Sequence, residues 1–491
     1  MLPYYASTVY PVFGGMFTVF KLSNTDAEAQ RRDSTTPISK EPDKRVWRQY
    51  LLDICIVLVM GVLLYCGASW QIFRIYTDAA KYQCYATAFW NGSHALTTLP
   101  PGQCAFIGRN APMDLIHSMQ SYGFPSFLIN FVESQSRSQP LHALPNEYPL
   151  LAIIPFTLGL VAPLPWYQVA FALWMALVAG IIYFVLKCFR STGAAIAFAV
   201  YLVVGSWATA EGRFDLIPAG LTLGALILAG RARWKWAFSL LAVATLLKFY
   251  PAVLILPLFL AQQMQTSGKW YSWRRWDALG MFIVVCAVVI GLSLVLSVEG
   301  TLAPLKYFGD RPIQVESSPS SLLWLGSFFG YPLHYEFTYG SLNVVSRLSH
   351  RVSLLSTFCL GVGLLYTFWL QWRGKLDVFT SSLLTLLIII ATGKVFSPQY
   401  LIWIAPLVAY VGQSNWKWLL SWGSVGLLTT AIYPYIYNTT PYILDVPHQP
   451  AFFPVVFVRN VIMLGFIIAL LYRATRKRRT ADQPLEVQAQ G

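Results

Sequence analysis

The chain has 491 residues, of which 56% are hydrophobic and only 11% are charged. Soluble proteins carry about 25% charged residues, and a soluble fold of this size could not hide so much apolar surface. The net charge of +14 comes from short Lys and Arg clusters between apolar segments, not from one basic face. We therefore expect an integral membrane protein surrounded by membrane lipids, with no nucleic-acid partner, and interpret the clusters as topology signals.

The first segment, residues 1–46, predicts a flexible cytoplasmic tail. Its start is apolar but contains Pro3, Pro11 and Gly14, and it precedes a polar stretch with several cations. This pattern differs from that of a cleavable signal peptide. At the other end of the chain, residues 474–491 predict a basic cytoplasmic tail.

Residues 47–473 between the tails predict an all-α, polytopic transmembrane helix bundle. Apolar stretches near the roughly 20 residues that a spanning helix needs recur along this region. Placing the basic clusters in the cytoplasm gives about a dozen spans in a cell (plasma) membrane, with both termini cytoplasmic. The expected spans are 51–70, 167–186, 192–210, 214–230, 236–247, 249–263, 279–298, 353–371, 377–392, 399–413, 417–434 and 454–472. The Pro-containing run 148–162 either dips into the membrane and returns or adds a span.

Three long outer loops follow from this topology, at about 71–147, 299–350 and 435–453. Loops this long are uncommon unless they are functional or disordered, and their many aromatic residues argue against disorder. The first loop holds Cys84 and Cys104. These two cysteines form a disulfide if the loop is extracytoplasmic, or remain two unpaired thiols.

Candidate acids lie at the two ends of the first outer loop. Asp78 follows the first span on a short stretch that predicts an amphipathic helix, and it lies between Arg74 and Lys81. An acid close to the membrane and beside aromatic rings can act as a general base, although a solvated acid paired with Arg74 or Lys81 explains the same pattern. Glu147 and Tyr148 mark the re-entry into the membrane, where Glu147 is a second site carboxylate or an interfacial helix cap.

Short outer turns carry cations that the topology rule disfavours, namely Arg213, Lys248 and Lys394. They could be side chains that extend to the interface, with Arg213 and Asp215 forming a local ion pair. Alternatively, all three converge on an anion at the interface, such as a lipid-linked phosphate. We favour convergence because three such cations share the outer side.

Other kinds of site find little support in the sequence. The chain has no Gly-rich phosphate loop, no nucleophile elbow and no recognisable His or Cys metal-binding pattern. We therefore expect no cofactor and no metal, and assign charge neutralisation to Arg and Lys.

Four segments, in order, resemble the GT-C class of membrane glycosyltransferases, and within it glycosyltransferase family 87, the polyprenyl-phosphate-mannose-dependent mannosyltransferases. The segments are T-D-A-A-K-Y-Q-C-Y-A, N-E-Y-P-L, G-R-F-D-L-I-P-A-G-L-T-L-G-A-L followed by L-L-K-F-Y-P, and V-F-S-P-Q-Y-L-I-W-I-A-P-L. They cover most of residues 71–413. The second segment departs from the family pattern, since Y-P-L stands where Y-P-P is expected.

The resemblance implies transfer of a hexose, usually mannose, from a polyprenyl-phosphate sugar donor to a hydroxyl of a lipid or glycan acceptor. The first-loop acid is the base in such enzymes, and it corresponds here to Asp78. We expect the three outer cations to stabilise the departing phosphate. Candidates for the substrate pocket are Asp215, Glu147, Tyr148, Gln399 and Tyr400, while Tyr400 and Trp403 could equally belong to an interfacial aromatic belt.

The competing hypothesis is a transporter or flippase of lipid-linked glycans, which would bind the phosphate with the same outer cations. Charged residues deep within spans would favour it. The candidates are Asp53 and Arg459, and both can lie near an interface, which favours the enzyme.

Overall fold

A computed structural model describes residues 44–70, 72–107, 113–269, 271–309 and 311–476. The chain divides into a compact unit, Leu52–Thr480, and a smaller unit formed by the two chain ends. Of the smaller unit the structure describes only residues 44–51, which are helical. The predicted tails lie outside the described residues, except that 44–46 and 474–476 belong to helices.

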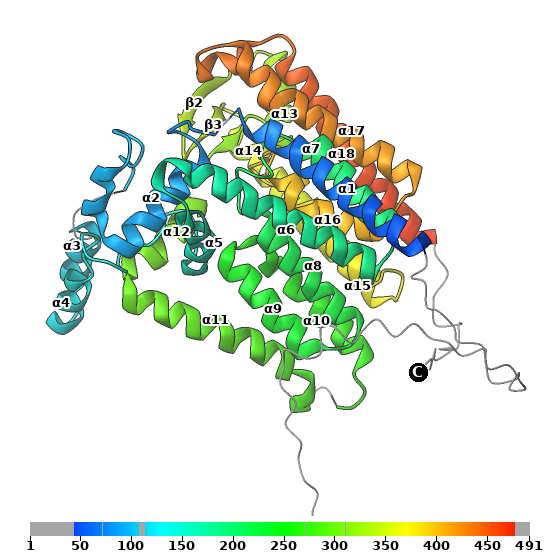
Figure 1. Cartoon of the computed structure of the whole chain (residues 1–491), viewed down its shortest axis with the longest axis horizontal. Coiled ribbons are helices and arrows are strands. Elements are labelled where there is room, and N and C mark those ends of the chain that lie inside the picture. Colours follow the sequence, from blue (N-terminus) through cyan, green and yellow to red (C-terminus); the bar gives the residue numbers. More distant parts are fainter. Residues whose placement is uncertain (1–43, 71, 108–112, 270, 310, 477–491) are drawn as a thin grey trace, which may run out of the picture. The chain divides into compact units, whose positions relative to one another are not determined.

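Each expected span contains a helix, so the helical bundle is confirmed (Figure 1). The helices are α1 (Lys44–Ala68), α6 (Tyr167–Phe189), α7 (Thr192–Ser206), α8 (Leu216–Gly230), α9 (Trp234–Leu247), α10 (Ile255–Gln265), α11 (Asp277–Leu296), α14 (Ser349–Trp372), α15 (Val378–Thr392), α16 (Tyr400–Gly412), α17 (Trp416–Thr430) and α18 (Phe452–Arg476).

Among the described residues, 5 helices are long and apolar enough to cross a membrane, judged by length and composition. They are Trp47–Ala68, Leu164–Phe189, Asp277–Leu296, Ser349–Trp372 and Phe452–Arg476. Several of the other expected spans are shorter apolar helices, such as Thr192–Ser206 and Trp234–Leu247. The chain is therefore a helical protein with membrane-length helices, and the predicted dozen spans stay a prediction.

The ambiguous run 148–162 forms a short broken helix and not a full-length span. α5 (Ile153–Leu158) lies between two 3₁₀ turns, Leu150–Ala152 and Gly159–Val161. Pro149 and Pro155 remove backbone donors here, which limits regular helix formation. The segment packs against α2 and α6.

Polar caps set where several helices begin. Ser191 Oγ accepts a hydrogen bond from Ala194 N at the start of α7, and Asp377 accepts from the amides of Phe379 and Thr380 at the start of α15. These bonds satisfy amides that have no partner within their own helix.

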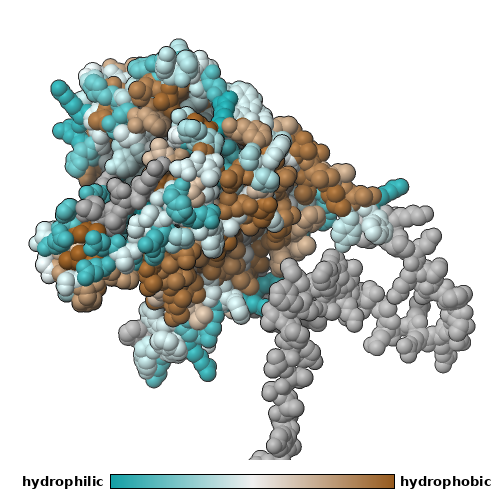
Figure 2. Space-filling view, turned by 60° about the vertical axis from the view of Figure 1, so that its left-hand side comes forward, coloured by the Kyte–Doolittle hydropathy of each residue, from teal (hydrophilic) through white to brown (hydrophobic). Residues whose placement is uncertain are grey.

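The long helices present apolar faces to the outside. α11 and α14 are largely unburied, with Val288 and Leu365 among their exposed side chains. Figure 2 shows a broad brown area of apolar residues on the molecular surface. Such a surface suits contact with lipid, because apolar patches of this extent are rare on soluble monomers.

Inside the bundle, α7 packs against α6, α16 and α17. Gly205 of α7 and Gly426 of α17 touch through their backbones, since a Cβ added to Gly426 would lie 2.9 Å from the Cα of Gly205. Only glycine permits this approach, so the crossing of α7 and α17 is unusually close.

The expected outer loops contain regular structure, of which only the short helix that carries Asp78 was predicted from the sequence. The first carries α2 (Asp78–Asn91), α3 (Met113–Ser121) and α4 (Ser126–Ser134), and the second carries α12 (Val298–Gly309), α13 (Ser318–Ser327) and a small sheet. The sheet has strand order β1-β3-β2, formed by β1 (Ile313–Gln314), β2 (His334–Thr338) and β3 (Ser341–Val345).

All pairings in this sheet are antiparallel, with Ile313 opposite Val344 and Glu336 opposite Asn343. The sheet and α13 share a hydrophobic core with the chain between α17 and α18. This core is separate from the main one inside the bundle. Cys84 and Cys104 form a disulfide, which settles the alternative left open by the sequence.

Candidate active site

Asp78 is the first residue of α2, in a position set by local capping. Thr77 Oγ1 accepts a hydrogen bond from Ala80 N at 3.1 Å and so begins the helix. The Asp78 carboxylate forms an ion pair with Arg213. The Asp78 side chain keeps 20% of its surface exposed, so it is reachable from outside while it is held by the guanidinium.

Arg213 lies in the turn between α7 and α8 and joins three parts of the chain. One terminal nitrogen pairs with Asp78, and the other donates to Oε1 of Gln399 just before α16. The local pair between Arg213 and Asp215, which was the alternative to convergence, is not the pairing found. Neighbours two positions apart diverge here because Asp215 turns into the bundle, where it is fully buried.

Asp215 pairs instead with Lys248, the residue that follows α9. Lys248 Nζ lies 2.5 Å from Asp215 Oδ1, and Trp403 Nε1 of α16 donates to the same oxygen. The side chains of Asp215 and Lys248 are 0% and 9% exposed. A buried charge requires such a partner, because isolated burial costs several kcal/mol.

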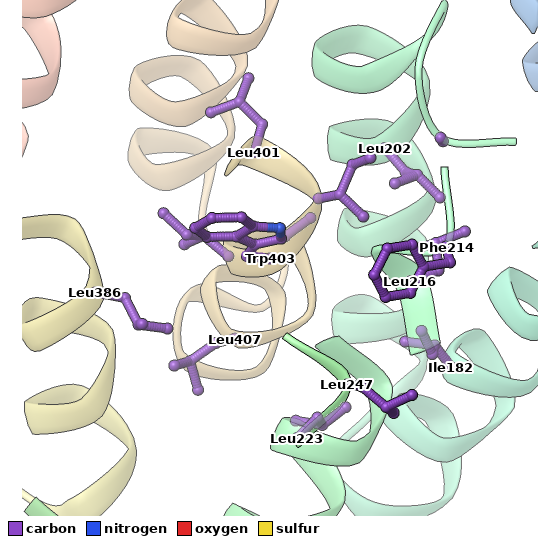
Figure 3. Close-up of a cluster of buried hydrophobic side chains, with 14 of the residues drawn as sticks. Ile182, Leu202, Phe214, Leu216, Leu223, Leu247, Leu386, Leu401, Trp403 and Leu407 are labelled. Carbon is purple, nitrogen blue, oxygen red and sulfur yellow. The ribbon is translucent and has the colours of Figure 1, made fainter. Parts of the chain in front are cut away.

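Aromatic rings enclose the Lys248 ammonium group. It lies 5.1 Å from the ring centroid of Trp403, 5.2 Å from that of Phe214 and 5.6 Å from that of Tyr148. Figure 3 shows the Trp403 indole with its nitrogen on the side of the segment that carries Phe214. Ring faces attract cations, so the cage adds to the ion pair in holding Lys248.

The two remaining aromatic candidates belong to the same assembly. Tyr400 stacks on Trp403 with ring centroids 4.0 Å apart, and Tyr250 stacks on it at 4.2 Å. Tyr148 packs edge-on against Tyr82 and Phe214. These rings therefore gather around the charged centre.

Glu147 pairs with a further cation near this centre. Its carboxylate is 3.8 Å from the ammonium of Lys81. Burial raises the pKa of Glu147 above its ordinary value, and the charges of Lys81, Arg311 and Arg213 oppose the rise. The acid therefore lies within electrostatic reach of several cations.

Lys394 does not join the other two predicted cations. Its side chain is exposed, and its carbonyl accepts a hydrogen bond from Gln314 N at 2.9 Å. Within the described part of the chain, its side chain forms no ion pair. Lys394 thus contacts β1 through its backbone. Of the three cations predicted to converge, only Arg213 and Lys248 take part in the charged centre.

Arg311, which lies just before β1, was not among the predicted site residues. Its guanidinium lies over the Tyr307 ring, 5.6 Å from the centroid, and its charge opposes the rise in the pKa of Glu147. The available signal was a cation inside a long outer loop, but nothing in the local pattern distinguished it from other loop cations.

The charges considered for a transporter both have partners. Asp53 of α1 pairs with Lys187, and it accepts a hydrogen bond from the Tyr183 hydroxyl at 3.0 Å. Arg459 of α18 is fully buried and lies 3.2 Å from Glu316. Among the described residues, no group of three or more His, Cys, Asp or Glu side chains is placed to hold a metal ion.

No model of a known protein family matches the chain, and no curated protein matches it. The fold and the site themselves define a helical protein with membrane-length helices and an acid–cation centre at the ends of α2, α7, α9 and α16.

Proposed function

We propose that the chain is an integral membrane hexosyltransferase of GT-C type. It transfers a hexose, mannose in the family that the sequence resembles, from a polyprenyl-phosphate carrier to a hydroxyl of a lipid or glycan acceptor. The reaction takes place at the extracytoplasmic face of the cell membrane. About a dozen spans and two cytoplasmic termini complete the proposed topology.

The observation that carries the proposal is the ion pair between Asp78 and Arg213 beside the caged Lys248. A partly exposed acid lies next to two fixed cations in a largely apolar protein. Transfer from a lipid phosphate needs an acid and cations. The carboxylate must take the proton from the acceptor hydroxyl, and the cations must stabilise the departing phosphate.

The proposed reaction is a single displacement. Asp78 accepts the proton of the acceptor hydroxyl, and the oxygen forms a bond to the anomeric carbon. The bond between that carbon and the phosphate oxygen breaks, and polyprenyl phosphate leaves with the bonding electrons. The anomeric configuration is inverted.

The ion pairs suggest how donor binding prepares this step. The donor phosphate would compete with Asp78 for Arg213, so that donor binding frees the carboxylate for the acceptor. Lys248 remains held by Asp215 and the aromatic cage, and Arg311 adds positive charge from the side of Glu147. Such fixed cations need little reorganisation during the reaction.

The disulfide supports the proposed orientation. Cys84 belongs to α2, the helix that Asp78 begins. Structural disulfides persist in oxidising compartments and are rare in the cytosol. A bridge within α2's loop therefore agrees with the side that the basic clusters assign to it.

The test is reconstitution of the full chain in proteoliposomes with a radiolabelled polyprenyl-phosphate hexose and extracted envelope lipids and glycans as acceptors. We expect label to move to an acceptor product. Replacement of Asp78 by Asn should reduce the rate by about 10²–10⁴-fold, the usual contribution of a general base.

The matched control is Asp114→Asn, which changes an exposed acid on α3. It should leave the rate unchanged. Near-normal turnover by D78N would remove Asp78 from the base role. If the label crosses the membrane on an unaltered carrier and forms no product, the transporter hypothesis replaces the enzyme.

A further inference from the structure

A pocket of about 540 Å³ opens in the chain between α17 and α18. Tyr433 interrupts the helical turns there with an extended backbone, at φ −122° and ψ 117°. A 3₁₀ turn, Ile436–Thr439, follows it. The residues that line it with aromatic or polar side chains are Tyr433, Tyr437, Asn438, Thr439 and Thr440, and Pro441 and Ile443 complete the lining.

The pocket differs chemically from the charged centre. Its lining offers two phenol rings, one amide and two hydroxyl groups, and no charged side chain. Asn438 and Thr439 are exposed. Aromatic faces combined with neutral donors and acceptors suit a polyhydroxylated neutral ligand, which has apolar ring faces and many hydroxyl groups.

Hydrogen bonds to a buried ion pair hold Tyr437 in place on one wall of the pocket. The Tyr437 hydroxyl donates to Glu316 Oε1 at 3.0 Å, and Glu316 pairs with Arg459 of α18. Tyr437 also packs against the second hydrophobic core, which includes Ile432, Val446 and Phe452. A satisfied polar network over a packed core gives the pocket a fixed shape.

The pocket and the charged centre follow the same ends of two packed helices. The Thr430 hydroxyl at the end of α17 donates to Val204 O near the end of α7 at 2.6 Å, and Tyr435 stacks on Trp207 with ring centroids 6.0 Å apart. The turn that carries Arg213 follows Trp207, so a ligand in the pocket lies at the same end of the bundle as the candidate base. In Figure 1 the strands β2 and β3 lie near this end of α17, and β2 contacts the turn before α18.

We propose that this pocket is the acceptor site and that it binds a neutral glycan. The sugar stacks on the Tyr433 ring and accepts or donates hydrogen bonds at Asn438 and Thr440. Its free hydroxyl then points toward Asp78, which takes the proton in the proposed transfer. The term acceptor rests on the proposed function, whereas binding of a neutral sugar does not.

The test measures binding separately from transfer. The purified full chain in detergent is examined by saturation-transfer NMR with methyl α-D-mannopyranoside and with an α-linked mannobiose as probes. Inorganic phosphate is added as a competitor. We expect saturation transfer to the sugars in the wild type and in D78N, with no competition by phosphate.

The double variant Asn438→Ala/Thr440→Ala should weaken sugar binding by about tenfold or more, because each net hydrogen bond contributes roughly 0.5–1.5 kcal/mol. The control Asn130→Ala removes an exposed amide from α4 and should bind as the wild type does. In the transfer assay, the double variant should raise the KM for acceptor and leave the KM for donor unchanged.

Each remaining outcome separates the two proposals. Absent sugar binding in the wild type, or binding that the double variant leaves intact, overturns the pocket. Displacement of the sugars by phosphate also overturns it, since the site would then recognise anions. Sugar binding without any transfer keeps the pocket and removes the proposed function.

Discussion

Each charge in the candidate centre finds its partner on another element. Arg213 pairs with Asp78 across to α2, and Lys248 pairs with Asp215 at the start of α8. Buried charges are tolerated only when paired and hydrogen-bonded. The pairs therefore serve both stability and chemistry, and variants can separate the two roles.

Replacing Asp215 by Ala leaves the Lys248 ammonium buried without its carboxylate. We expect a loss of about 3–5 kcal/mol in the free energy of unfolding, typical of breaking one side of a buried pair. Thermal denaturation in detergent measures it. The double variant Asp215→Ala/Lys248→Met should recover much of the stability but no transfer activity, and a double variant as unstable as the single one would contradict this account.

A second buried acid, Glu211, lies in the turn before Arg213 with only 1% of its surface exposed. Neither of its carboxylate oxygens has a hydrogen-bond partner among the residues that the structure describes. Burial raises the pKa of Glu211 from 4.5 to about 8. The folded protein thus holds a proton there that the unfolded chain releases at lower pH.

This difference predicts a pH dependence of stability. Between pH 4.5 and about 8 the folded state binds more protons than the unfolded state, so stability falls as the pH rises, by at most about 1.4 kcal/mol per pH unit. Glu211→Gln should remove this slope. Melting temperatures of both proteins across the window measure the effect, and parallel curves would show that Glu211 titrates normally.

At the scale of elements, the backbone contact of α7 and α17 positions both sides of the site. Gly205 precedes the turn that carries Arg213, and Gly426 precedes Tyr433 and the pocket. The close crossing therefore sets the separation between the charged centre and the proposed acceptor pocket.

Gly426→Ala adds a methyl group where a Cβ would lie 2.9 Å from backbone. The helices must separate, at a cost of about 1–3 kcal/mol, typical of overpacking. We expect lower thermal stability and a raised KM for acceptor. The control is Gly423→Ala on the same helix, where no atom lies within 4 Å of the added Cβ, and it should be neutral or stabilising by up to about 1 kcal/mol.

At the scale of the whole molecule, the proposed topology can be tested at the α2 loop. The basic clusters predict that this loop lies outside the cytoplasm, and the Cys84–Cys104 bridge agrees with that prediction. The free cysteines, such as Cys359, offer an internal comparison.

In intact cells we expect the partly exposed Cys104 to react with a membrane-impermeant maleimide only after a reductant is added. The fully buried Cys84 should be alkylated only after the protein is both reduced and denatured. Mass spectrometry identifies the labelled peptides. The double variant Cys84→Ser/Cys104→Ser should lose about 2–4 kcal/mol of stability, whereas Cys359→Ser should not. Free thiols at both positions in untreated cells would contradict the orientation.

The positions of the helices were predictable because a long apolar run has one main solution in a membrane. The ion-pair partners were not. Asp215 lies two residues from Arg213 in sequence, yet the turn directs Arg213 to Asp78, which lies far away in the chain. The hairpin of β2 and β3 was also missed, because short strands inside a loop carry a weak pattern.

The burial of Arg459 against Glu316 has a consequence for biosynthesis. Strand β1 and helix α13 leave the ribosome well before α18, so Glu316 lacks its partner Arg459 until α18 is made. Phe452 and Val456 complete the same core only then. The pocket therefore forms late during translation. A nascent chain that stops short of α18 lacks the Arg459 side chain and the core residues that support the pocket.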